Sequence, residues 1–256
     1  MRQRNSQVSL LAIVSPLAIA MACAAAPALA GGPEQIEQLQ VRRGDWLLEY
    51  YGQFGEANGS DEGREHSGTA FYGLTDGLAI GGELQTSYRS GPEINDRLYF
   101  DFDSVVALLT FADPEQGPVG AGVWLQAGLD TDGELAQLEA RLILEKRTDR
   151  VWARANTMLR RINEEDEEGT LVAYGAAVQF AAAERLWLGV EGSGQAFRVS
   201  GFNQQPFKDG HYLGPSLNYE LELTSQTTLD VGLAYFRRLD SDDLRDTARL
   251  SLQLTF

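Results

Sequence analysis

The last seven residues restrict the fold of this chain more than any other segment. Apolar and polar residues alternate there without a break: Leu250-Ser251-Leu252-Gln253-Leu254-Thr255-Phe256. The end of a soluble chain is usually frayed and wet. A strand that closes a barrel in a bilayer instead places one face in lipid and its last aromatic ring at the interface. The ending therefore predicts an outer-membrane β-barrel, with Leu252, Leu254 and Phe256 as its C-terminal insertion signature.

The first thirty residues are typical of a secretory signal peptide. Arg2 and Arg4 precede an apolar run over residues 8–26, and Ala28-Leu29-Ala30 has the small-x-small pattern that signal peptidase cleaves. A second interpretation is a lipoprotein processing site at Cys23, although the Leu expected three residues earlier is absent. Cleavage after residue 30 removes the only cysteine, so the mature chain has no disulfide.

The charge of the chain excludes one class of partner and suggests another. The formal net charge is -16, and removal of the two signal arginines makes it -18. Nucleic-acid binding needs a basic surface, so we expect no nucleic-acid partner. Acidic loops fit a position beside lipopolysaccharide, where divalent cations bridge negative groups. After residue 30 no stretch of 18 apolar residues occurs, which excludes a membrane-spanning helix.

Period-2 alternation predicts an all-β fold, a transmembrane antiparallel up-and-down β-barrel of twelve strands. The expected strands are 44–55, 64–73, 78–90, 96–110, 119–129, 134–147, 150–161, 169–181, 185–198, 210–221, 227–238 and 245–256. An even strand number places both termini on one side. The organisation is then a signal peptide over 1–30, a periplasmic N-terminal segment over 31–43 and the barrel over 44–256.

The connections between these strands fall into two alternating sets. One set consists of tight turns and one longer connection, at 74–77, 112–118, 148–149, 182–184 and 224–226. The other set is more acidic and includes the longest connections, at 56–63, 91–95, 130–133, 163–168, 199–209 and 239–243. Barrels of this class have short periplasmic turns and longer external loops. We therefore expect the second set outside the cell.

Aromatic residues gather near both ends of the expected strands, which predicts two interfacial girdles. Those expected at the periplasmic ends are Trp46, Tyr72, Phe111, Trp152, Phe180, Trp187, Tyr219 and Phe256. Those expected near the outer ends are Phe54, Tyr88, Tyr99, Phe100, Phe197, Tyr212, Tyr235 and Phe236. Strict alternation turns some of these rings, such as Trp152 and Trp187, toward the lumen.

The polar strand faces should line the lumen, because a charge facing lipid at mid-bilayer costs ~2–4 kcal/mol. Charges of both signs are expected there: Glu83, Asp101, Asp103, Glu139, Glu145, Glu191, Glu220, Asp230, Arg89, Arg141, Arg154, Arg160, Arg238 and Arg249. They form either a transverse field across a constriction or a network of paired charges that keeps the interior closed. The constriction candidates are Glu139, Arg141, Arg154, Glu191, Asp230 and Arg238.

Many inward positions carry small residues, which either leave space in the lumen or permit strong strand curvature. These positions are Gly120, Gly122, Gly128, Gly175, Ala177, Gly189, Gly214, Ser216 and Gly232. The mature segment before Gly44 has only about 13 residues, too few for a plug domain. A narrow open lumen and a plugged lumen both fit a barrel of twelve strands.

Catalytic and metal-binding interpretations have little support, and we expect no catalytic residue, metal or cofactor. The only histidines are His66 and His211. Because strand neighbours point to opposite faces, His66 and Ser67 cannot form a relay by themselves. His211 with Asp209 is better explained as a solvated loop pair. The acidic stretch 164–168 offers oxygen ligands for Ca²⁺ but lacks the spacing of a dedicated site.

Short motifs resemble those of poorly characterised proteobacterial outer-membrane barrels. They are Phe71-Tyr72-Gly73-Leu74-Thr75-Asp76-Gly77-Leu78-Ala79-Ile80-Gly81, then residues 138–146 (LEARLILEK), 188–191 (LGVE) and 213–219 (LGPSLNY). More distantly, the chain is similar to barrels that accompany phenol-degradation operons, for which uptake of small aromatic compounds is suggested. The resemblance spans about 64–256, consists mostly of turn motifs, and transfers no binding or catalytic residue.

Three functions follow from this interpretation, in decreasing order of support. The first is a small pore or transporter for low-molecular-weight solutes. The second is a non-conducting structural barrel, or an accessory of an export system. The third is an outer-membrane hydrolase, which needs a catalytic role for one of the two histidines. In each case the expected surroundings are outer-membrane lipid, lipopolysaccharide and the outer-membrane assembly machinery.

Overall fold

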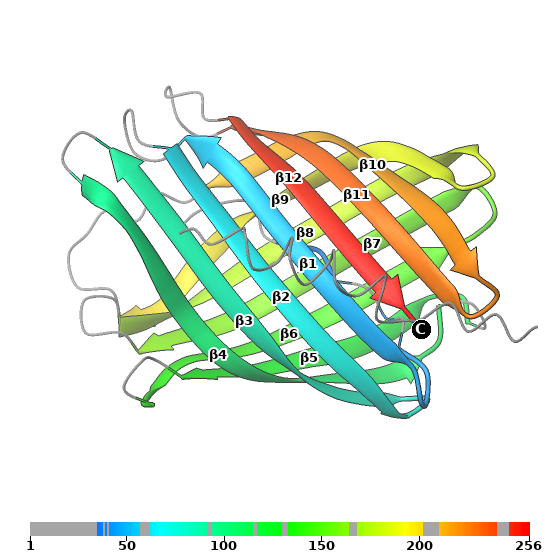
Figure 1. Ribbon diagram of the computed structural model, residues 1–256, viewed down its shortest axis with the longest axis horizontal. Helices are drawn as coiled ribbons and strands as arrows, with labels where there is room; N and C mark the ends of the chain where they lie inside the picture. The colour runs from blue at the N-terminus through cyan, green and yellow to red at the C-terminus, as the bar shows by residue number, and fades with distance from the viewer. Residues whose placement is uncertain are drawn as a thin grey trace, which may run out of the picture.

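The period-2 pattern folds into a single closed antiparallel barrel of twelve strands (Figure 1). The computed structural model describes residues 35–37, 39, 41–56, 62–91, 94–114, 117–129, 133–163, 168–201, 210–239 and 246–256. Among them, no helix is long and apolar enough to cross a membrane. The expected signal peptide with Cys23, and loop residues 164–167, lie outside the described residues.

Each strand begins and ends within three residues of its predicted bounds. The strands are β1 (Trp46–Glu56), β2 (Glu62–Thr75), β3 (Leu78–Gly91), β4 (Ile94–Ala112), β5 (Gly120–Leu129), β6 (Leu135–Arg147), β7 (Val151–Asn163), β8 (Glu168–Ala183), β9 (Leu186–Gly201), β10 (His211–Thr224), β11 (Thr227–Arg238) and β12 (Asp246–Thr255). Every strand pairs with its neighbour in sequence, and β1 pairs with β12. The predicted fold class is therefore confirmed.

The first and last strands close the barrel along a regular seam. Leu254 lies opposite Leu48, and Leu252 lies opposite Tyr50. Beyond the strand ends, Trp46 N donates to Phe256 O at 2.8 Å, and Phe256 N donates to Trp46 O at 3.0 Å. The predicted C-terminal signature thus belongs to the closing strand. Its role in insertion stays a prediction.

Burial alternates along the strands in the sense that a barrel in lipid requires. In β5 the lumen side carries Trp124 and Gln126, which are buried, whereas the outer side carries Leu125 and Leu129, which are exposed. A soluble protein would hide the leucines and expose the glutamine. Here the outward apolar band has lipid as its solvent.

Outward aromatic rings gather at both ends of the barrel, as the sequence predicts. At the end with the tight turns, which we call the turn end, the exposed rings are Trp46, Tyr72, Phe111, Phe180 and Tyr219. At the opposite loop end the exposed rings are Phe54, Phe197 and Tyr235. Trp152, Trp187, Tyr212 and Phe236 are buried. The side chains of Tyr88, Tyr99 and Phe100 lie outside the described set.

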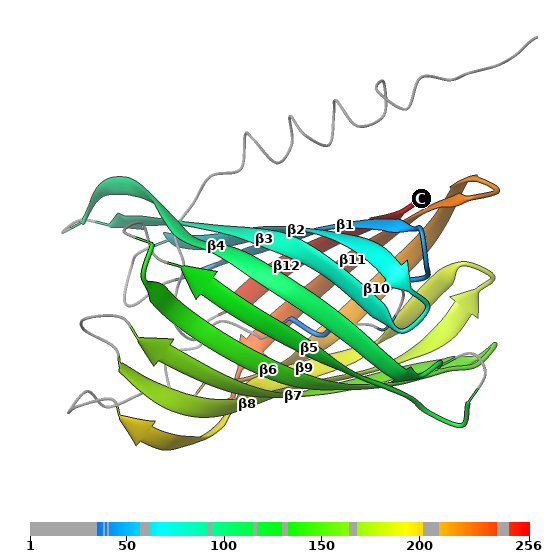
Figure 2. The same ribbon diagram turned by 90° about the horizontal axis from the view of Figure 1, so that it is seen from below.

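The described residues of the segment that precedes β1 lie inside the barrel, a location that the sequence does not indicate. The described residues of 35–41, which we call the N-terminal segment, run between the walls (Figure 2). Ile36, Glu37, Leu39 and Val41 are all at most 6% exposed. A segment this short can fill the lumen without forming a domain. An extended chain covers about 3.3 Å of length per residue, and its side chains fill the width of the lumen.

Candidate functional site: the filled lumen

The N-terminal segment is hydrogen-bonded to the opposite wall of the barrel. Glu37 N donates to Asn156 Oδ1 at 2.7 Å, and Asn156 Nδ2 donates to Glu37 O at 3.4 Å. Leu39 N donates to Glu145 Oε2 at 2.9 Å. Asn156 and Glu145 are inward residues of β7 and β6. These bonds satisfy backbone groups that would otherwise be buried without partners.

Arg141, a predicted constriction residue, links the segment to a charged cluster on the wall. Its guanidinium donates to Gln35 O at 3.0 Å and to Glu37 Oε1 at 2.9 Å. The same group donates to Glu139 Oε1 at 2.6 Å, and Arg160 donates to Glu139 Oε2 at 2.7 Å. The predicted residues Glu139 and Arg141 therefore meet, and the segment joins their network.

Apolar side chains of the segment complete a hydrophobic cluster near the turn end. Leu39 and Val41 pack with seven buried residues of the wall: Leu47, Phe71, Ala79, Val106, Leu108, Trp124 and Ile143. Phe71 and Trp124 meet edge to face, with ring centroids 5.0 Å apart. This cluster packs the segment against the wall of the barrel near the turn end.

Small inward residues make room for the segment, which explains part of the glycine pattern. A Cβ on Gly122 would lie 2.5 Å from Leu39 Cδ2, and one on Gly175 would lie 2.9 Å from Ile36 Cγ1. A Cβ on Gly73 would lie 1.9 Å from the carbonyl oxygen of Arg42. Space for the chain is thus one reason for glycine at these three positions.

Arg154 and Glu191, two further predicted residues, lie in a second charged group. Arg249 forms an ion pair with Glu191, and both side chains are buried. Arg154 stacks on the Trp152 ring at 4.3 Å and donates to Gln179 Oε1 at 3.3 Å. Arg154 and Glu191 thus have partners different from those of Glu139 and Arg141.

The last two predicted residues are Asp230 and Arg238. Asp230 lines a lumen cavity, and its Oδ1 is buried without a hydrogen-bond partner in the structure. Arg238 is buried at the end of β11, opposite Tyr212 of β10 and close to the loop end. The lumen thus holds ion pairs as well as charged groups, such as Asp230, in which one atom lacks a hydrogen-bond partner. The transverse-field interpretation and the closed-network interpretation each explain part of this arrangement.

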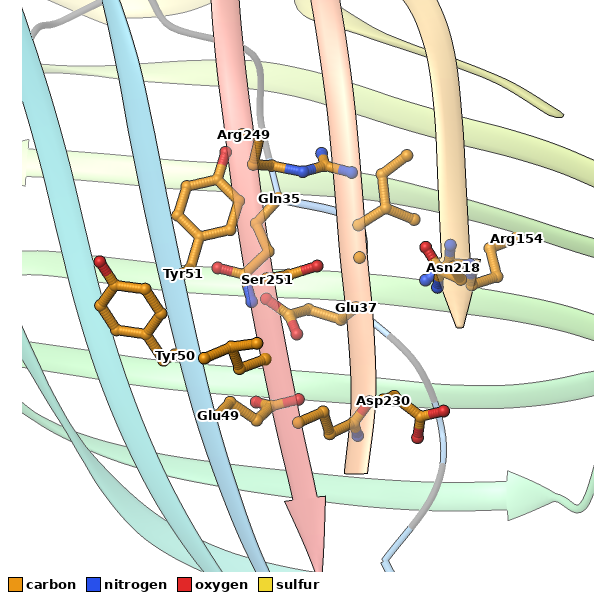
Figure 3. Close-up of a pocket in the computed structure, with 14 residues that line it drawn as sticks. Gln35, Glu37, Glu49, Tyr50, Tyr51, Arg154, Asn218, Asp230, Arg249 and Ser251 are labelled. Carbon is orange, nitrogen blue, oxygen red and sulfur yellow. The ribbon is translucent and has the colours of Figure 1, made fainter. Parts of the chain in front are cut away.

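A cavity separates the N-terminal segment from β1, β10, β11 and β12 (Figure 3). It offers about 40 Å³ to the centres of water-sized molecules. One water needs about 10–15 Å³ on this measure, so roughly three waters fit. Its lining includes Glu37, Glu49, Asp230, Arg154 and Arg249.

Sequence reasoning missed Glu37, Asn156 and Glu49 in this site. One signal was available: Ile36, Leu39 and Val41 are apolar residues in an otherwise polar stretch. Such residues need a partner surface, and the only apolar surface near a barrel end is lipid or the lumen. Alternation also offered a signal for Glu49, because it shares a face of β1 with Gln53, opposite the apolar face of Trp46, Leu48 and Phe54.

Both histidines lie on the outer face beside a tyrosine. Tyr50 Oη is 2.6 Å from His66 Nδ1, and Tyr174 Oη is 2.9 Å from His211 Nδ1. Ser67 lies opposite Tyr51, whereas His66 lies opposite Gly52, so His66 and Ser67 face opposite sides of the wall. Asp209 lies outside the described residues. Among the residues with described side chains, no group of three or more His, Cys, Asp or Glu is arranged to hold a metal ion.

Comparison with known proteins bears on the fold. No family model and no curated protein sequence matches the chain. The chain is similar to the COG4313 outer membrane channel from Pseudomonas putida F1, with a TM-score of 0.55, 16% identity, and coverage of 88% of this chain and 98% of that chain. The fold is that of an outer-membrane β-barrel. It is also similar to the NanC porin, with a TM-score of 0.53, 9% identity, and coverage of 80% and 98%.

Proposed function

We propose that this chain is an outer-membrane channel for low-molecular-weight hydrophilic solutes, closed in the described state by its own N-terminal segment. The observation that carries the proposal is the segment itself, held in a polar lumen by Arg141, Asn156 and Glu145. The similarity to a channel and a porin supports it at the level of the fold. Of these three residues, Arg141 is the one predicted to form the constriction, and it holds the segment in position.

Passage of a solute requires the segment to move. The cavity of about 40 Å³ beside the segment holds roughly three waters, less than a hydrated sugar or amino acid needs. Removal of the segment would expose the charges of β6 and β7 to a continuous lumen. Those charges of both signs would then orient polar solutes across the opening.

The filled lumen also favours a second candidate, the non-conducting barrel. In this case the segment is a permanent part of the core, and the outer surface or loops carry the function. Outer-membrane lipid surrounds the barrel in both cases. We propose further that lipopolysaccharide contacts the loop end, and that the assembly machinery recognises Leu252, Leu254 and Phe256 of the closing strand.

Planar-bilayer conductance of the refolded mature chain, with and without residues 35–41, tests the channel. We expect brief or small openings for the intact chain and long, larger steps for the deletion, because the deletion removes the obstacle. Insertion of both proteins is checked by protease protection of the strands. A deletion variant that is inserted but silent would contradict the channel and leave the non-conducting barrel. The matched control replaces residues 35–41 by a Gly/Ser stretch of equal length.

A further inference from the structure

Two buried carboxylates face one another across the lumen cavity. Glu37 belongs to the N-terminal segment and Glu49 to β1, and both line the cavity (Figure 3). Their exposed fractions are 4% and 8%. Among the charged groups, Glu37 acts most strongly on Glu49. A like-charged pair in such a place is unfavourable unless something positive lies between or beside the two groups.

The protein supplies too little positive charge at this point. Arg141 pairs with Glu37 and Glu139, and Arg160 pairs with Glu139. Glu49 Oε2 is buried without a hydrogen-bond partner in the structure. With Glu83, which also acts on Glu49, four carboxylates meet two guanidinium groups here, and negative charge is in excess.

A neutral ligand stands next to Glu49 and is also unpaired. Gln253 lies directly opposite Glu49 in the register of β1 and β12, lines the same cavity, and is 6% exposed. Its Oε1 and Nε2 are both buried without partners in the structure. A buried amide costs free energy unless it is hydrogen-bonded or coordinated, so this side chain indicates an occupant of the cavity.

The two arginines that line the cavity, Arg154 and Arg249, interact with other groups. Arg249 pairs with Glu191, and Arg154 stacks on Trp152 while it donates to Gln179. Both retain one buried unpaired nitrogen, Arg154 Nε and Arg249 Nη1. These two nitrogens would attract an anion to their side of the cavity. Replacement of chloride by formate in the experiment below distinguishes an anion from a cation. They do not neutralise Glu49.

We propose that a compact cation, of the size of potassium or ammonium, binds between Glu37 and Glu49 with the Gln253 amide oxygen as a neutral ligand. The excess of carboxylates over guanidinium groups around Glu49 attracts a cation. The small volume of the cavity excludes a larger organic cation. Since one carboxylate belongs to the N-terminal segment and the other to the wall, the ion clamps the segment in the lumen.

Thermal unfolding of the detergent-solubilised mature chain at pH 8 tests this site without any conductance measurement. Potassium chloride replaces tetramethylammonium chloride at constant ionic strength, which also keeps chloride constant. We expect the unfolding midpoint to rise by about 3–5 °C at a potassium concentration ten times Kd. Glu49→Gln should abolish the rise.

Glu222→Gln is the matched control, since Glu222 is an exposed carboxylate beside Arg185 at a turn. It should keep the full potassium response. An equal response in Glu49→Gln, or no response in the wild type, would overturn the cation site. A response to formate in place of chloride, without one to potassium, would assign the cavity to an anion and also overturn it. A silent bilayer with an intact potassium response would instead contradict the channel alone.

Discussion

At the scale of single residues, arginine supplies the positive charge in the lumen of this barrel. The chain has only two lysines, Lys146 and Lys208, and the rest of its basic residues are arginines. In the lumen, guanidinium groups lie over aromatic rings: Arg154 over Trp152, and Arg147 over Trp152 at 4.6 Å. A planar guanidinium can stack and form several hydrogen bonds together, which an ammonium group cannot do. Lysine would hold these positions less rigidly.

Arg154→Gln should make the lumen more selective for cations, since it removes one positive charge from the cavity wall. The measurement is the reversal potential in a potassium chloride gradient, in the variant that lacks residues 35–41. We expect it to move toward the potassium equilibrium potential. Arg185→Gln at an exposed turn is the control and should leave the reversal potential in place. Equal shifts in both variants would remove Arg154 from the conducting path.

At the scale of elements, the N-terminal segment is held by a close balance. Burial of Ile36, Leu39 and Val41 contributes on the order of 5–9 kcal/mol. Ordering its seven residues costs on the order of 7–14 kcal/mol of backbone entropy. The hydrogen bonds to Asn156, Glu145 and Arg141 therefore decide whether the segment stays in the lumen.

Asn156→Leu should release the segment, because it removes both hydrogen bonds to the backbone of Glu37. Their loss costs about 1–3 kcal/mol, which corresponds to roughly five- to 150-fold more of the released state. The measurement is the rate of cleavage after Glu37 by a glutamyl endopeptidase. Thr157→Val, exposed on the outer face of the same strand, should cleave at the wild-type rate. Protection of Glu37 in Asn156→Leu would show that other contacts hold the segment.

At the scale of the whole molecule, closure depends on one seam. The wall is a single sheet, so the pairing of β1 with β12 removes both of its edges at once. In lipid every unpaired backbone group costs several kcal/mol, and an open sheet would expose two rows of them. We therefore expect the barrel to fold completely or not at all, without a stable form in which the seam is open.

Deletion of Phe256 should lower the yield of folded barrel, because it removes the two hydrogen bonds with Trp46 that end the seam. The measurement is the fraction that migrates as folded barrel in unheated electrophoresis after refolding into lipid vesicles. Phe256→Tyr keeps the backbone and an interfacial ring, and should fold as well as the wild type. Equal folding of the deletion variant would exclude a role for the last residue.

The sequence predicts the wall well and its contents poorly, for physical reasons. Alternation and turn residues are local, so all twelve strands and the inward positions of Glu139 and Arg141 follow from them. Contacts of the N-terminal segment join residues 106 and 119 positions apart, and no local pattern marks them. Which lumen charges pair depends on strand register and tilt, which alternation does not determine.

The sequence distance between the N-terminal segment and its anchors has a consequence for the order of folding. Asn156 of β7 meets Glu37, 119 residues earlier, only after the strands that carry the anchors are in place. Contacts so distant in sequence form late, because the entropy of loop closure is lost before the contacts contribute any stabilisation. We therefore expect the wall to close before the N-terminal segment enters it. In the channel proposed above, opening would reverse this last step of folding.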